Sequence, residues 1–294
     1  MTRDINEIIP HASAVQKLND NPFRFLEGPV WDAKRKMLFF TDPLDHKIIS
    51  MNQQGRFEAI FTQSGYGNGM CLNAEGNLVF CKMDEGCLAQ INPDSKTLNR
   101  LFAKGYNGRP FNATNDVICD QYGGYYVTDP FFTFGPKTQD IEATYYCDEN
   151  GNVKRVATDS IKPNGLAFSP DHKKLYIDDT GSVNVWCYDV CRNGDLINKD
   201  LFCQIQRPDF TDGLAPVQYH GEADGIKVDL AGNLYITTVT GIQIFNNRGD
   251  YLGMIKMPGK ESAANCVFGG PNLTTFYITA RTTLFSIEVM IPGC

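Results

Sequence analysis

Short runs in which apolar and polar residues alternate recur along the chain, and six of them begin alike. In the copy that starts at Asn164, an oxygen-bearing residue leads and apolar positions follow. A turn at Asp171 then precedes an aromatic and β-branched run that ends at Asp179. Alternation with a period of two predicts β-strands. The leading residues, called heads below, are Glu27, Asn68, Asn115, Asn164, Asp224 and Asn265.

The heads are 41 to 60 residues apart, and this spacing marks an internal repeat. In the first unit, turn residues separate four runs with strand periodicity, at 29–31, 37–41, 47–51 and 57–61. No unit contains the sustained 3.6-residue apolar stripe of an amphipathic helix. We therefore expect an all-β fold, a six-bladed β-propeller with four antiparallel strands per blade, forming a single domain over residues 1–294.

Blades arranged radially close on themselves and hide most strand edges. The segment at 11–18, before the first head, is too short to be a domain. We expect it to be the outer strand of the last blade, next to 276–279 and 284–289, where it would close the ring.

If each innermost strand begins at its head, all six heads open onto one end of the central channel. The connections between second and third strands emerge at the same end and should wall a pocket; they lie at 42–46, 82–85, 129–132, 179–181, 238–240 and 281–283. Two inserts, at 105–114 and 207–223, should enlarge this pocket, because long loops in a compact fold usually serve function.

Composition excludes several classes of protein. The chain is 42% apolar and 21% charged, as globular proteins are. Its net charge of −7 and its lack of basic runs argue against nucleic-acid binding. No window approaches the roughly 20 apolar residues of a membrane span. The N-terminus lacks the features of a secretory signal, so we expect a cytoplasmic protein whose ten cysteines are reduced and mostly buried.

The heads supply carboxylate and amide oxygens and no His or Cys. Such hard ligands suit Ca²⁺ first, Mg²⁺ or Mn²⁺ next, and Zn²⁺ poorly. A structural alternative is that these side chains only cap turns at strand starts. Two carboxylates that converge on one axis would, however, be costly without a cation. The pattern therefore favours one divalent metal in the central channel.

Several stretches carry a family resemblance. They are EGPVW from Glu27, NATNDV from Asn112, TDP from Thr128, PNGLAFSPD from Pro163, DGIKVD from Asp224 and FGGP from Phe268. With them the chain resembles the gluconolactonase / senescence marker protein (regucalcin) family from about Glu27 onward, and is closer to its microbial gluconolactonase branch. The animal members carry an arginine where this chain has Ala113, and a glutamate pair where it has Asp129-Pro130-Phe131. The choice of substrate therefore stays open.

The resemblance implies a six-bladed propeller that holds a divalent metal and hydrolyses a sugar lactone. By matching motif, Glu27, Asn164 and Asp224 would be metal ligands. Asn115 would be a fourth ligand or would hold the metal-bound water and the substrate, and Asp224 would also act as general base. Ca²⁺ is the expected metal, with Mg²⁺, Mn²⁺ or Zn²⁺ as alternatives.

Other residues are weaker candidates for substrate binding. They are Asn68, Lys82, Arg109, Asn112, Asp129, Phe131, His220 and Arg281. The basic side chains of Lys82, Arg109 and Arg281 could bind substrate hydroxyls or a carboxylate, or could be ordinary surface charges. His220 could donate to substrate or simply lie in a solvated loop. Phe131 and Phe132 could form an apolar wall for a sugar or pack between blades.

The sequence thus favours a metal-dependent lactonase whose partner is a small sugar lactone. The metal would polarise the lactone carbonyl and a carboxylate would activate water. No G-x-S-x-G motif supports a serine mechanism. A phosphotriesterase or fluorophosphatase on the same metal site is one alternative. A noncatalytic Ca²⁺-binding propeller that binds a protein is another, and the oligomeric state stays open.

Overall fold

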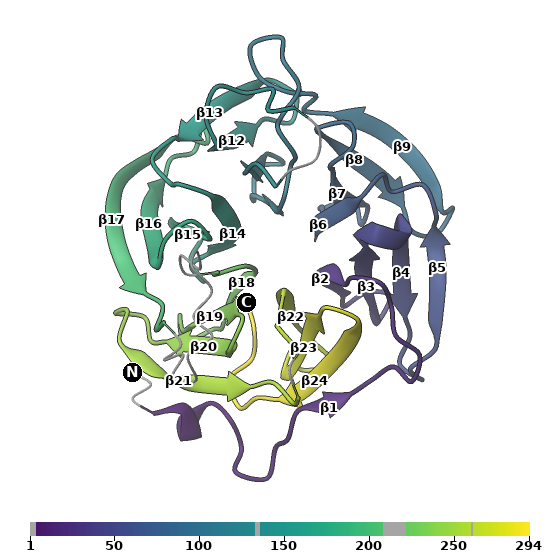
Figure 1. Ribbon diagram of the computed structural model, residues 1–294, viewed down its shortest axis with the longest axis vertical. Coiled ribbons are helices and arrows are strands. Elements are labelled where there is room, and N and C mark those ends of the chain that lie inside the picture. The colour runs from purple at the N-terminus through teal and green to yellow at the C-terminus, as the bar shows by residue number, and fades with distance from the viewer. Residues whose placement is uncertain (1–3, 133–135, 208–221, 260) are drawn as a thin grey trace.

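Six four-stranded antiparallel sheets surround a central axis, and each sheet runs from an inner strand at the channel to an outer strand at the rim (Figure 1). The computed structural model describes residues 4–132, 136–207, 222–259 and 261–294. The fold is therefore the predicted six-bladed β-propeller with four antiparallel strands per blade.

The blades follow one another along the chain. Blade 1 contains β2 (Glu27–Asp32), β3 (Met37–Asp42), β4 (Lys47–Met51) and β5 (Phe57–Phe61). Blade 2 contains β6 (Gly67–Leu72), β7 (Leu78–Lys82), β8 (Cys87–Asn92) and β9 (Thr97–Phe102). Blade 3 contains β10 (Val117–Cys119), β11 (Tyr125–Asp129), β12 (Ala143–Cys147) and β13 (Val153–Ala157).

The second half repeats this order. Blade 4 contains β14 (Pro163–Phe168), β15 (Lys174–Asp179), β16 (Asn184–Val190) and β17 (Leu196–Gln204). Blade 5 contains β18 (Ile226–Val228), β19 (Leu234–Thr238), β20 (Gly241–Phe245) and β21 (Tyr251–Lys256). Blade 6 contains β22 (Asn265–Gly269), β23 (Thr275–Ala280), β24 (Thr283–Glu288) and β1 (Gln16–Lys17). The described residues also form two short 3-10 helices, η1 (Ile5–Glu7) and η2 (Pro43–Asp45).

The N-terminal strand closes the ring as predicted, because β1 pairs with β24 at the rim of blade 6. The strand covers only Gln16 and Lys17 of the predicted segment 11–18. Beyond it, the backbone N–H of Leu284 donates to the side-chain Oδ1 of Asn19 (2.7 Å), so a side chain replaces the backbone partner there. Backbone strand pairing therefore stops at Lys17, and a hydrogen bond to the Asn19 side chain continues the contact with blade 6.

Apolar side chains fill the space between neighbouring blades. One core cluster, for example, joins Phe39 and Ile48 of blade 1 to Leu78, Phe80 and Ile91 of blade 2. The middle strands are covered on both faces by adjacent blades, and every residue of β7, β11 and β19 is buried. Each fully buried large apolar side chain stabilises the fold by roughly 1.5–3 kcal/mol. This packing gives the channel a rigid wall on which polar groups can be held.

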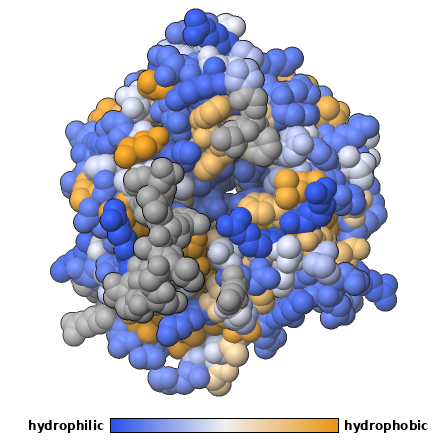
Figure 2. Space-filling model, viewed as in Figure 1, coloured by the Kyte–Doolittle hydropathy of each residue, from blue (hydrophilic) through white to orange (hydrophobic). Residues whose placement is uncertain are grey.

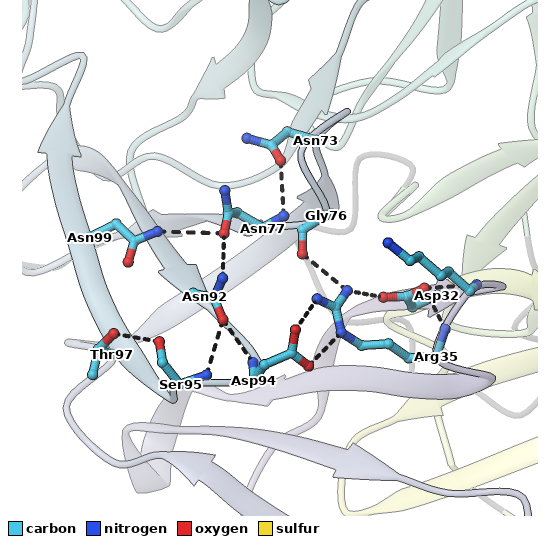
Figure 3. Close-up of polar contacts among 11 residues, drawn as sticks. Asp32, Arg35, Asn73, Gly76, Asn77, Asn92, Asp94, Ser95, Thr97 and Asn99 are labelled. Carbon is cyan, nitrogen blue, oxygen red and sulfur yellow. Dashed lines mark hydrogen bonds and ion pairs between the residues drawn. The ribbon is translucent and has the colours of Figure 1, made fainter.

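A polar cluster also joins blades 1 and 2, on the turns that follow β2, β6 and β8 (Figure 3). The Arg35 guanidinium bonds to Asp32 (2.5 Å), to Asp94 (2.5 and 2.8 Å) and to the carbonyl of Gly76 (3.1 Å). Asp32 is almost fully buried, whereas most of the Asp94 side chain is exposed. This cluster lies at the end of blade 1 away from the head Glu27.

All ten cysteines are free thiols, and seven of them are buried, as expected from the sequence. In the part of the chain that the structure describes, no helix has the length and apolar character needed to cross a membrane.

Candidate active site

Five of the six heads line one cavity of about 820 Å³ at the end of the channel. They are Glu27, Asn68, Asn115, Asn164 and Asp224. The hollow at the centre of the ring is visible in the space-filling view (Figure 2). Gly28, directly after the first head, has a positive φ of 48°, and a Cβ there would lie 2.3 Å from the Asn68 carbonyl oxygen. Only glycine lets the first two blades approach so closely at the cavity.

All six connections between second and third strands contribute to the cavity wall, as the sequence predicts. Their lining residues are Pro43, Leu44, Met83, Phe132, Thr180, Val239, Thr240 and Arg281. Of the insert at 207–223, residues 208–221 lie outside the described part of the chain, but Glu222 and Ala223 line the cavity.

The insert at 105–114 is not among the described lining residues, contrary to the expectation that it enlarges the pocket. The side-chain amide of Gln139 donates to the carbonyls of Tyr106 (3.2 Å), Arg109 (2.9 Å) and Pro110 (2.8 Å). These hydrogen bonds hold the insert against the segment that contains Gln139.

Glu27 is buried, Asp224 is half-buried, and the pKa values of both carboxylate heads are raised. Burial, followed by the negative charges of Asp224 and Asp116, raises the pKa of Glu27 well above its usual value. Burial is also the main cause that raises the pKa of Asp224 to about 7, and a hydrogen bond from Asn164 opposes it. A cation between these carboxylates would offset the cost of desolvating their charges and would cancel their mutual repulsion.

A second pair of carboxylates lies close to the heads, with Asp116 directly after Asn115 and Asp178 on β15. Asp116 and Asp178 are buried, and each has one carboxylate oxygen without a hydrogen-bond partner among the described residues. Burial is the main cause that raises the pKa of both groups. The Asp116 charge raises the pKa of both Glu27 and Asp224, and the Asp224 charge raises that of Asp178. This mutual repulsion favours a cation in the cavity.

A neighbouring side chain orients the amide head Asn164. The Nδ2 of Asn164 donates to the Thr180 hydroxyl (2.9 Å), which in turn donates to the carbonyl of Ala223 (2.6 Å). This arrangement leaves the Oδ1 of Asn164 available as an acceptor. Asn265 differs, because its Oδ1 accepts from the backbone N–H of Cys266 (2.8 Å) and the residue is not among the described lining residues.

The donor set fits a hard divalent cation. Glu27 and Asp224 offer carboxylates, and Asn115 and Asn164 offer amide oxygens, around one cavity. No group of three or more His, Cys, Asp or Glu side chains that could hold a metal occurs in the described residues. A site made largely of imidazole or thiolate ligands, as zinc prefers, therefore has no candidate there.

The weaker candidates separate into two groups. Asn68 and Arg281 line the cavity, and the Arg281 guanidinium lies over the Phe25 ring at 5.3 Å from its centre. Lys82 is not among the described lining residues, because its ammonium pairs with Asp84 (2.7 Å) and Glu85 (3.3 Å). The side chain at the wall is Phe132 rather than Phe131.

Two further candidates, Asn112 and Asp129, support the loop that leads to Asn115 instead of lining the cavity. The Asp129 carboxylate accepts from the backbone N–H groups of Asn112 and Ala113 (2.9 Å each). The Asn112 Oδ1 accepts from the N–H groups of Thr138 (3.1 Å) and Gln139 (2.9 Å). Arg109 is exposed, and His220 lies outside the described residues.

Several lining residues have no individual signal in the sequence. Glu222 and Thr180 belong to loops that the repeat places near the cavity, but nothing in their local pattern marks them. Phe25 precedes the first head by two residues and lies outside every predicted strand. Only the position of these residues in the blade repeat could have indicated them.

Comparisons with known proteins agree with the fold. A sequence profile described as the SMP-30/Gluconolactonase/LRE-like region matches residues 25–282. The chain is 30% identical over 273 residues to a gluconolactonase of Zymomonas mobilis, which covers 85% of this chain and 74% of that protein. It is 25% identical over 270 residues to a pentonolactonase of Haloferax volcanii, covering 90% and 84%. The solved structure of a gluconolactonase from Xanthomonas campestris has a TM-score of 0.83 and 26% identity, covering 97% and 92%.

Proposed function

The chain belongs to the SMP-30/gluconolactonase/LRE-like family, and from this premise we propose that it hydrolyses a sugar lactone to the corresponding acid with the help of a divalent cation. The convergence of four oxygen-bearing heads on one cavity carries this proposal. They are Glu27, Asn115, Asn164 and Asp224, and the two carboxylates among them have raised pKa values.

These four residues would hold the cation, with Ca²⁺ as the expected ion. When bound, the cation supplies a Lewis acid that polarises the lactone carbonyl. Asp224 would accept a proton from the water whose oxygen attacks the carbonyl carbon. The ring C–O bond then breaks, and the ring oxygen leaves as a hydroxyl after it takes up the proton.

The remaining wall would bind the substrate. Asn68 and Arg281 offer polar groups to the sugar hydroxyls, and Phe25, Met83 and Phe132 offer apolar surface to the C–H faces of the ring. Thr180 fixes the orientation of Asn164 by accepting from its amide.

A panel of aldonolactones assayed with Ca²⁺, Mg²⁺, Mn²⁺ or Zn²⁺, and with a chelator, tests substrate and cofactor together. We expect turnover that disappears with the chelator and returns with the cation. No turnover with any of these metals would overturn the lactonase proposal. Phosphotriesters in the same panel test the related hydrolase, and cation binding without any turnover would indicate a noncatalytic propeller.

Asp224→Asn tests the proposed base. We expect kcat to fall by at least about 100-fold, because general base catalysis contributes roughly 10²- to 10⁴-fold. Arg109→Ala, at an exposed position outside the cavity wall, is the control and should keep kcat within about twofold. Unchanged hydrolysis in Asp224→Asn that still binds Ca²⁺ would show that Asp224 is not the base.

A further inference from the structure

Three aspartates occupy the same position in their blades, the last residue of the second strand. They are Asp42 in blade 1, Asp129 in blade 3 and Asp179 in blade 4. All three are at most 2% exposed. A buried carboxylate at this position needs hydrogen-bond donors, and the donors are the same kind of group in each blade.

Each carboxylate accepts from two consecutive backbone N–H groups, which belong to the residues three and two positions before the head. Asp42 accepts from Arg24 (2.9 Å) and Phe25 (3.1 Å), ahead of Glu27. Asp129 makes the same pair of bonds to Asn112 and Ala113 (2.9 Å each), ahead of Asn115.

In blade 4, Asp179 accepts from Ile161 (3.0 Å) and Lys162 (2.7 Å), ahead of Asn164. One device thus recurs in three blades with the same offset to the head. We call it the carboxylate clamp and define it by Asp42, Asp129 and Asp179.

The clamp follows the distribution of the proposed cation ligands. The three blades that carry it hold Glu27, Asn115 and Asn164. The corresponding residues in blades 2 and 6 are Lys82 and Ala280, which cannot accept such bonds, and their heads are not proposed ligands. If the aspartates served only to stabilise the blades, we would expect them in blades 2 and 6 as well.

Blade 5 carries Asp224 and has Thr238 at the clamp position. There the loop before the head is held from outside the blade, because the Thr180 hydroxyl of blade 4 donates to the carbonyl of Ala223. The same hydroxyl accepts from the amide of Asn164. Thr180 therefore couples the clamped head Asn164 to the unclamped head Asp224.

We propose that Asp42, Asp129 and Asp179 are positioning residues that fix three heads in the geometry for cation binding before the ion arrives. This inference rests on the proposed function only in that Glu27, Asn115 and Asn164 are the cation ligands. Second-layer groups that hold ligands in place typically change metal affinity 10- to 100-fold when removed, and a preset site avoids the entropy cost of ordering its loops.

Single Asp→Asn variants at the three positions test the clamp, because asparagine keeps the size and replaces one acceptor oxygen with a donor. Ca²⁺ titration by calorimetry should give a Kd raised at least about tenfold in each variant. Asp229→Asn is the matched control. Asp229 is also fully buried and accepts from two backbone N–H groups (2.9 Å each), but it lies at the far end of β18. Its Kd should stay within twofold.

A double-mutant cycle separates positioning from a general structural role. Asp129→Asn should weaken Ca²⁺ binding much less in an Asn115→Ala background, because the ligand that it positions is gone. Asp42→Asn should keep its full effect in that background. An unchanged Kd in the folded Asp→Asn variants, or an equal rise in Asp229→Asn, would overturn the proposal.

Hydrogen–deuterium exchange of the unmutated protein gives a test that needs no variant to fold. The amides of residues 24–25, 112–113 and 161–162 should stay protected when Ca²⁺ is removed with a chelator. Protection that appears only with Ca²⁺ would show that the clamp is not preset. Ca²⁺ binding without lactone turnover would reject the proposed enzyme activity and still leave the clamp testable by affinity.

Discussion

At the scale of single residues, the carboxylates in and around the cavity bind protons more tightly than exposed carboxylates do. Burial raises the pKa of Glu27 well above its usual value and raises that of Asp224 to about 7. Burial likewise raises the pKa of Asp129 to about 7, although its two backbone hydrogen bonds oppose the shift. Such shifts cluster at functional sites, where a ligand or a proton compensates the buried charge.

These shifts give the stability of the chelated protein a defined pH dependence. Because the folded pKa values lie above the unfolded ones, the folded state binds more protons between about pH 4 and pH 7. The stabilisation is complete below the unfolded pKa and is lost as the pH rises through about 7. We expect the Tm in chelator to fall between pH 5 and pH 8.

Saturating Ca²⁺ should reduce this fall, because the cation replaces the protons at Glu27 and Asp224. Calorimetric titration in two buffers with different ionisation enthalpies should show that Ca²⁺ binding releases protons near pH 7. A Ca²⁺ affinity that does not change between pH 5 and pH 8 would contradict the raised pKa values of Glu27 and Asp224, or their role as ligands.

At the scale of elements, the turns at the other end of the blades have a different task. The cluster around Arg35 in Figure 3 fastens the turn after β2 to the turns of blade 2. Its bonds to Asp32 and Asp94 raise the pKa of the Arg35 guanidinium, and most of the side chain is shielded from water. The cluster joins two blades without touching the cavity wall.

Arg35→Ala should therefore lower stability and leave the active site intact. We expect the free energy of unfolding in urea to fall by about 1–3 kcal/mol, since charge-assisted hydrogen bonds and a buried partner are lost. Lys173→Ala is the control, because Lys173 is 82% exposed and lies 3.6 Å from Asp171. It should change stability by about 0.5 kcal/mol or less. A loss of Ca²⁺ affinity in Arg35→Ala would contradict this separation of tasks.

The blade plan and the heads could be predicted from the sequence, because they depend on local period and on regular spacing. Most of the individual side chains of the wall could not, although Asn68 and Arg281 were named, and Phe132 shows why. Alternation stops at Asp129, where β11 ends, so periodicity no longer tells which of the two phenylalanines faces the cavity. The pairing of Lys82 with Asp84 and Glu85 was equally hidden, since it depends on the conformation of the turn.

At the scale of the whole molecule, the ring depends on a contact between segments far apart in sequence. The Asn19 side chain accepts from the N–H of Leu284, and its amide donates to the carbonyls of Asn21 (2.8 Å) and Thr282 (3.3 Å). Ile8, farther toward the N-terminus, is fully buried in the core cluster of blades 5 and 6. The N-terminal segment thus fastens the last two blades.

Asn19→Ala tests this fastening. We expect a loss of about 1–3 kcal/mol, because the buried N–H of Leu284 would lose its acceptor. Gln16→Ala is the matched control, since Gln16 is exposed and pairs with Ser286 through the backbone. It should change stability by about 0.5 kcal/mol or less. Equal effects of the two substitutions on urea unfolding would show that the Asn19 side chain has no special role.

The closing contact between Asn19 and Leu284 spans 265 residues, and this separation has a kinetic consequence. During synthesis, β1 leaves the ribosome long before its partner β24, so the ring cannot close until the last blade has been made. Contacts between such distant segments form slowly, because loop closure must precede them. The four proposed ligands come from blades 1, 3, 4 and 5, so cation binding should report a late folding step that follows the formation of individual blades.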